Sequence, residues 1–112
     1  SPLPVKYISG GALLISKSLF NQIGGWNEKY FFYYEDLDLC RAVRRASKQV
    51  YYYPNCRVIH RHGFSGQNLA DSQHQWRRLI PSSIKFHGCF KHYLINFIIW
   101  SGQKWQKLQK SI

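Results

Sequence analysis

Residues 31–46 read FFYYEDLDLCRAVRRA, and the elements around them can be placed from this stretch. Apolar side chains recur in it at i, i+3, i+4 and i+7, at Leu39, Ala42, Val43 and Ala46. This spacing predicts a helix over 35–46 with one apolar face. The acids lie at its start and the arginines toward its end, an arrangement that the helix dipole favours.

Outward from this helix, the sequence predicts only short elements. The expected elements are extended segments over 5–9 and 12–16 around Gly10-Gly11, a helix over 17–23 ending at Gly24-Gly25, strands over 50–53 and 57–61, and helices from about residue 75 interrupted at Gly88 and Gly102. The predicted fold class is α/β. Short strands and helices occupy 1–74, and a basic amphipathic helical tail occupies 75–112.

Composition predicts a globular chain with an anionic partner. Apolar residues make up 45% and aromatic residues 17% of 112 residues, which suits one folded domain at most. The absence of methionine predicts a piece of a longer protein, and three scattered cysteines fit a reducing compartment. Residues 1–74 hold nine Lys/Arg and all five acids, whereas 75–112 hold seven Lys/Arg and no acid. Such a tail suggests nucleic acid, anionic lipid or a phosphorylated substrate as partner.

Glu35, Asp36 and Asp38 are the first candidates for chemistry. They follow the apolar run 31–34, which would supply one wall of a pocket, and a carboxylate so placed can act as a general base. The alternative is helix capping, because carboxylates in a first turn satisfy free amide groups.

Histidines form a second candidate group. His60 and His62 would point to the same side of a strand, where they could hold a divalent cation or contact phosphate. The alternative is two ordinary polar residues at a strand end. His87, Cys89 and His92 lack the matching half that a structural zinc site needs.

Taken in order, several motifs resemble glycosyltransferase family 2, and within it the rhamnosyltransferase-like enzymes of bacterial polysaccharide assembly. These motifs are SGGALLI at 9–15, GGWNE at 24–28, FYYEDLDLC at 32–40, VYYYP at 50–54 and VIHRHG at 58–63. The resemblance covers about residues 5–66. It implies the C-terminal, acceptor-side part of a glycosyltransferase A type fold, whose N-terminal half binds the nucleotide sugar.

The resemblance also implies roles for individual residues. Asp36 would be the catalytic base of a single inverting displacement, removing a proton from an acceptor hydroxyl. The other implied site residues are Glu35, Asp38, Gly10, Gly11 and Trp26 for acceptor binding, and His60 with His62 as second choice for metal or diphosphate. A Mg²⁺ or Mn²⁺ ion in the full-length enzyme would stabilise the leaving diphosphate.

Departures from the family pattern limit the activity expected of these residues alone. The metal-binding Asp-x-Asp of the nucleotide-binding half has no counterpart here, because Asp36-Leu37-Asp38 belongs to the base motif. Asn27 and Ser47 stand where the family usually has Asp and a helix-ending Gly. We therefore expect a nucleotide sugar to bind through the missing half, a glycan or lipid-linked acceptor to bind here, and no turnover by this chain alone.

The tail predicts contact with an anionic membrane surface. One helical line carries Leu94, Ile98, Trp105, Leu108 and Ile112, and the far side carries Lys104, Lys107 and Lys110. Trp100 and Trp105 suit a headgroup region. The alternative is a surface helix whose apolar stripe packs on the domain.

The expected location is cytoplasmic, peripheral on the inner face of the cell membrane. The uncharged run 92–103 is too short to span a bilayer, which takes about 20 residues. Two other functions stay open at this point, a basic nucleic-acid-binding module and a non-catalytic domain that contacts a membrane surface. The clustered acids argue against nucleic acid.

Overall fold

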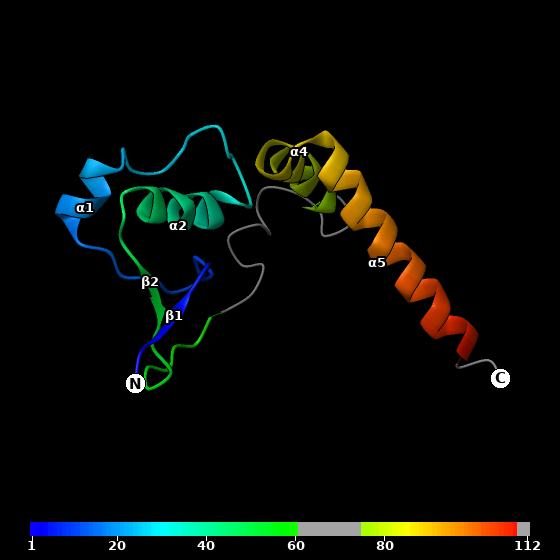
Figure 1. The fold of residues 1–112 in the computed structure, drawn as a ribbon, viewed down its shortest axis with the longest axis horizontal. Coiled ribbons are helices and arrows are strands. Elements are labelled where there is room, and N and C mark those ends of the chain that lie inside the picture. Colours follow the sequence, from blue (N-terminus) through cyan, green and yellow to red (C-terminus); the bar gives the residue numbers. More distant parts are fainter. Residues whose placement is uncertain (61–74, 110–112) are drawn as a thin grey trace.

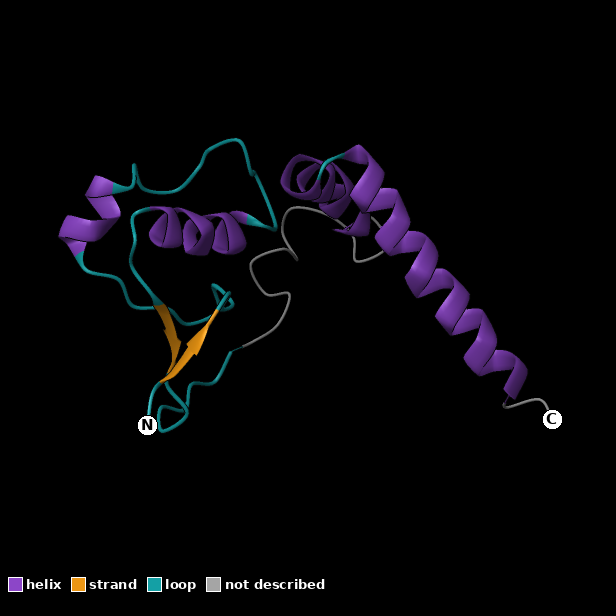
Figure 2. Cartoon of the chain, in the orientation of Figure 1, coloured by secondary structure: helices purple, strands orange, loops and turns teal. Residues whose placement is uncertain are grey.

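The computed structural model describes residues 1–60 and 75–109, in which a small sheet lies at one edge of the molecule and helices make up most of the rest (Figure 1). The elements are β1 (Leu3–Val5), α1 (Lys17–Gln22), α2 (Glu35–Arg45), β2 (Val50–Tyr52), α4 (Gln75–His87) and α5 (Cys89–Gln109). In Figure 2 the strands lie near the N-terminus, and α4 and α5 form a helical end of their own. Helices with a two-stranded sheet are compatible with the predicted α/β class. The larger glycosyltransferase A sandwich stays a prediction.

β1 and β2 form an antiparallel pair that differs from the expected strands. The paired residues are Leu3 with Tyr52, Pro4 with Tyr51 and Val5 with Val50. The first strand therefore precedes the predicted 5–9 segment, and its proline is tolerated because β1 lies at a sheet edge. The strand predicted over 57–61 is wrong over 57–60, since this segment has no neighbouring strand to bond with in the described chain, and the extended segment predicted over 12–16 is not part of the sheet. Residue 61, the last of the predicted strand, lies outside the described residues.

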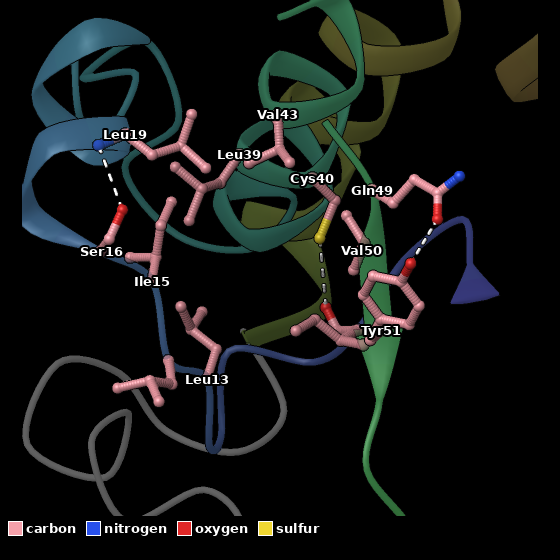
Figure 3. A pocket seen from close by; sticks show the side chains of 12 residues that line it. Leu13, Ile15, Ser16, Leu19, Leu39, Cys40, Val43, Gln49, Val50 and Tyr51 are labelled. Carbon is pink, nitrogen blue, oxygen red and sulfur yellow. Dashed lines mark hydrogen bonds between the residues drawn. The ribbon is translucent and has the colours of Figure 1, made fainter. Parts of the chain in front are cut away.

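A small apolar core forms between α2 and β2. Its buried members are Cys40, Val43 and Val50, and the partly buried side chains packed on them are Val5, Ile8, Ile15, Leu19 and Ile23. Figure 3 shows a cavity of about 260 Å³ between α2, β2 and the 13–16 segment. The Cys40 thiol borders it and donates a long hydrogen bond to the carbonyl of Ile8, at 4.0 Å. The core thus joins α2 to the sheet and fixes where its first turn lies.

Local backbone conformations end both helices of this half. Gly24 follows α1 with φ +84°, as the glycine pair predicts. Ser47 follows α2 with φ 57°, and the Lys48 amide donates to the Val43 carbonyl at 3.1 Å. This left-handed position costs a serine about 1 kcal/mol more than a glycine, so the departure noted at Ser47 has a structural consequence.

α4 and α5 form a hairpin, and α5 extends away from the sheet (Figure 1). Gly88, with φ +84°, separates the two helices as predicted. The interruption predicted at Gly102 is wrong, because this residue lies within the 21-residue helix α5. One interior glycine costs about 1 kcal/mol, which a long helix can absorb. No helix in the described part of the chain is long and apolar enough to cross a membrane.

Candidate active site

The Asp36 carboxylate lies in the first turn of α2, held by two backbone amides. The Gly10 amide donates to its Oδ2 at 2.8 Å, and the Leu37 amide donates to its Oδ1 at 2.8 Å. Each carboxylate oxygen has two lone pairs, so each can still accept a hydrogen bond from a ligand hydroxyl. The capping alternative is therefore partly realised, because Oδ1 serves an amide of its own first turn.

The Gly10-Gly11 turn touches both Asp36 and His60. A Cβ added at Gly10 would lie 3.3 Å from the Asp36 Cβ, and one added at Gly11 would lie 3.0 Å from His60 Nδ1. Neither glycine has a positive φ, so these positions favour glycine through close approach and not through backbone conformation. Four residues singled out from the sequence thus meet at one turn.

An open groove of about 800 Å³ runs beside this turn. Its lining includes Val5, Tyr7, Ile8, Ser9, Gly11, Ala12, Leu13, Leu14, Tyr51, Tyr52, Tyr53, Cys56, Val58 and His60. Aromatic rings and polar atoms on one wall are typical of binding sites for small polar ligands. His60 therefore joins the glycine turn to the groove.

The other two acids have different surroundings. Asp38 Oδ2 accepts a hydrogen bond from the Asn27 side-chain amide at 2.8 Å, and Asn27 Oδ1 accepts the Lys29 amide at 3.1 Å. An aspartate at position 27 would place a second negative charge against Asp38, so the departure at Asn27 replaces repulsion with a hydrogen bond. Glu35 Oε2 is enclosed by protein atoms and has no hydrogen-bond partner among the described residues.

Trp26 belongs to the surface near α1. Its ring packs edge-on against Phe20, with centroids 6.1 Å apart, and it remains 45% exposed. An exposed indole can stack on a ligand. No contact here tests the acceptor-binding role predicted for it.

The loop before α2 is strained and is held in place by α4. Tyr33 and Tyr34 have φ of 68° and 71°, and Tyr34 precedes α2 without capping it through a side chain. Ser82 Oγ donates to the Phe32 carbonyl at 2.9 Å, and Lys85 Nζ donates to the Lys29 carbonyl at 2.6 Å. Such conformations persist where surrounding contacts over-determine them.

A buried chain of hydrogen bonds continues from this loop into α5. The Tyr34 hydroxyl donates to Ser83 Oγ at 3.1 Å, and Ser83 Oγ is 2.8 Å from Nδ1 of the buried His92. The Asn96 side chain donates to the His92 carbonyl at 2.9 Å. Sequence reasoning missed these residues. The signal that could have found them is a polar pair, Ser82-Ser83, between apolar positions of a predicted helix.

Aromatic and cationic side chains complete this junction. The Arg41 guanidinium lies 3.6 Å from the centre of the Phe86 ring and donates to the Phe86 carbonyl at 3.1 Å. Tyr34 packs on the same ring at 5.2 Å. Burial, followed by the neighbouring Arg41, His92 and Lys91, lowers the pKa of His87 below its ordinary value of 6.5.

The described residues do not by themselves fit a divalent metal ion. No three histidine, cysteine, aspartate or glutamate side chains gather to form such a site within 1–60 and 75–109. His62 lies outside the described residues, and His92 uses Nδ1 toward Ser83. Mg²⁺ takes several oxygen ligands, so the Mg²⁺ or Mn²⁺ ion stays a prediction.

Curated glycosyltransferases share matching segments with this chain. An N-acetylglucosaminyl-diphospho-decaprenol L-rhamnosyltransferase of Mycobacterium tuberculosis is 42% identical over 60 residues, which are 54% of this chain and 20% of that protein. A low-salt glycan biosynthesis hexosyltransferase of Haloferax volcanii is 38% identical over 56 residues, 50% of this chain and 17% of that protein. The rhamnosyltransferase WbbL of Escherichia coli K12 is 28% identical over 72 residues, 64% of this chain and 27% of that protein.

The resemblance to rhamnosyltransferase-like glycosyltransferases, predicted from the motif order, is confirmed by these relatives. The matches span between 17% and 27% of the relatives' own lengths. No protein-family model and no solved structure matches the chain.

Proposed function

We propose that this chain is the acceptor-side part of a glycosyltransferase and that Asp36 is its general base. The observation that carries the proposal is the Asp36 carboxylate, fixed by the Gly10 amide at 2.8 Å, next in the chain to Gly11, which lines the groove together with His60. The similarity to named rhamnosyltransferases supports the same reaction class. The donor would be a nucleotide sugar, bound by a part of the longer protein outside these residues.

The proposed reaction is a direct displacement. Asp36 accepts the proton of an acceptor hydroxyl, and that oxygen forms a bond to the anomeric carbon while the bond to the nucleoside diphosphate breaks. Gly10 orients the carboxylate during this step, and the tyrosines of the groove offer ring faces to the acceptor. Glu35 and Asp38 then act indirectly, because one is enclosed and the other is bonded to Asn27.

The acceptor class in this proposal is a glycan or a lipid-linked sugar. The name of the mycobacterial relative describes transfer to a sugar on a diphospho-decaprenol carrier. For this chain we propose an acceptor of that general kind, within polysaccharide assembly in the cell envelope. The identity of the sugars is left to the assay.

The proposal is tested by the stereochemistry of the product. The longer protein that contains this chain would be incubated with a panel of nucleotide sugars and lipid-linked acceptors, and the new glycosidic bond would be examined by NMR. A single displacement predicts an anomeric configuration opposite to that of the donor. Retention of configuration, or transfer to no acceptor of the panel, would contradict the proposal.

A further inference from the structure

α5 exposes apolar side chains around most of its surface, and one row of them lies on the side opposite the buried His92. We call this row the apolar crest; its described members are Leu94, Ile98, Trp105 and Leu108, with exposed fractions of 44%, 58%, 65% and 60%. At about 100° per residue, the crest lies roughly 160–240° around the helix from His92. His92 is the residue of α5 that is buried, against Ser83 of α4. The predicted fifth member, Ile112, lies outside the described residues.

Among the described residues, this stripe therefore does not pack on the domain. α5 contacts α4 through His92, which lies 2.8 Å from Ser83 Oγ, on the side of the helix opposite the crest. In Figure 1, α5 leaves the hairpin and extends away from both the sheet and α2. Its crest is open to another partner.

Charge decides which partner the crest fits. Residues 75–112 carry seven Lys/Arg and no acid. By helical position, Lys91 and Lys104 flank the crest on opposite sides, at roughly 60° and 80° from its centre, so Lys104 lies nearer the crest than the far side predicted for it. The Lys104 ammonium also lies 4.9 Å from the centre of the Trp100 ring, and a tryptophan beside a lysine suits a headgroup region.

We propose that the apolar crest of α5 docks on an anionic lipid surface, with the helix lying along the membrane plane. Apolar side chains would enter the boundary between headgroups and acyl chains, and flanking lysines would meet lipid phosphates. A second copy fits less well, because pairing two such helices brings cations together without an acid on either. This docking does not depend on the proposed transfer reaction.

The test is co-sedimentation of the full chain with vesicles of phosphatidylglycerol and phosphatidylcholine, compared with phosphatidylcholine alone. Wild type should bind the anionic vesicles, and each flanking lysine replaced by glutamine should weaken binding roughly fivefold. The crest variant Ile98→Glu with Trp105→Glu should lose binding at least about tenfold. The matched control is Gln103→Glu with Gln106→Glu, which makes the same charge change on the His92 side of the helix.

Circular dichroism of each variant would verify that helix content is unchanged. If the crest variant and its control lose vesicle binding equally, the added negative charge alone explains the loss, and the proposal is overturned. Equal binding of wild type to neutral vesicles, or binding to neither kind, would also overturn it. A wild-type protein that is dimeric and does not bind vesicles, together with a monomeric crest variant, would also overturn the proposal. That result would assign the crest to a second copy of the chain. A variant that lacks the Asp36 carboxylate should bind vesicles as wild type does, which separates this test from that of the transfer reaction.

Discussion

Replacing Ser83 with alanine removes the one oxygen that joins the loop before α2 to helix α5. The hydroxyl contacts the Tyr34 hydroxyl at 3.1 Å and Nδ1 of His92 at 2.8 Å. His92 is only 4% exposed, so water cannot readily replace the lost partner. His92 Nδ1 then keeps only a longer contact with the Asn96 side-chain amide, at 3.4 Å. A buried polar group with poor hydrogen bonding costs about 1–3 kcal/mol, and the half-buried Tyr34 adds a smaller cost. The expected loss in the free energy of unfolding is about 2–4 kcal/mol.

This loss is large for a chain of this size, whose total stability is on the order of 5–15 kcal/mol. Urea unfolding followed by circular dichroism should show a midpoint lower by about 1–2 M, from a typical dependence of 1–3 kcal/mol per M. The matched control is Ser101→Ala, which loses an exposed hydrogen bond to the Ile98 carbonyl and should cost less than about 0.5 kcal/mol. If both variants unfold at the same midpoint, the buried chain of hydrogen bonds does not hold the hairpin to the loop.

Two further predictions concern the glycine turn and the acid response. In an enzyme that includes the nucleotide-binding half, Gly10→Ala should lower kcat about tenfold, because the new Cβ would lie 3.3 Å from the Asp36 Cβ and shift the carboxylate by a few tenths of an ångström. The control Gly102→Ala places its Cβ in open space and should leave kcat unchanged. Because the pKa of His87 is lowered in the folded chain, the unfolded chain takes up a proton first as the pH falls through 6.5. His87 therefore lowers the free energy of unfolding below pH 6.5 and does not affect it well above that pH. His87→Gln should flatten the fall of the melting temperature on acidification from neutral pH, and an identical fall in both proteins would refute this role.

Sequence periodicity predicted the helices well and the strands poorly. The spacing around Leu39 places α2 at Glu35–Arg45, and Gly24 ends α1, because helices are specified by local contacts and local caps. A strand also needs a partner, and the partner of Val50 is Val5, 45 positions earlier. Local patterns therefore displaced the first strand and predicted another, over 57–61, that does not form up to residue 60.

Several candidate residues named from the sequence come together in the structure, their roles stay predictions, and the contacts that hold them in place were not predicted. The glycine turn, Asp36 and His60 are close in the structure, as their family roles would require. The contact of Ser83 with Tyr34 spans 49 positions and depends on how α4 packs, which no local pattern encodes. The departures from the family pattern at Asn27 and Ser47 could be noted from the sequence, and each has a local structural consequence. Asn27 donates a hydrogen bond to Asp38, and Ser47 adopts a positive φ.

The central claim is that Asp36 is the base, and its most direct test compares Asp36→Asn with Asp38→Asn in the longer enzyme. Asparagine keeps the shape of the side chain, and its one oxygen can still accept either the Gly10 or the Leu37 amide, but it cannot take a proton from the acceptor. We predict a kcat lower by about 10²–10⁴-fold for Asp36→Asn with donor affinity unchanged, and a much smaller change for Asp38→Asn, whose partner is Asn27. Near-normal turnover of Asp36→Asn would contradict the account.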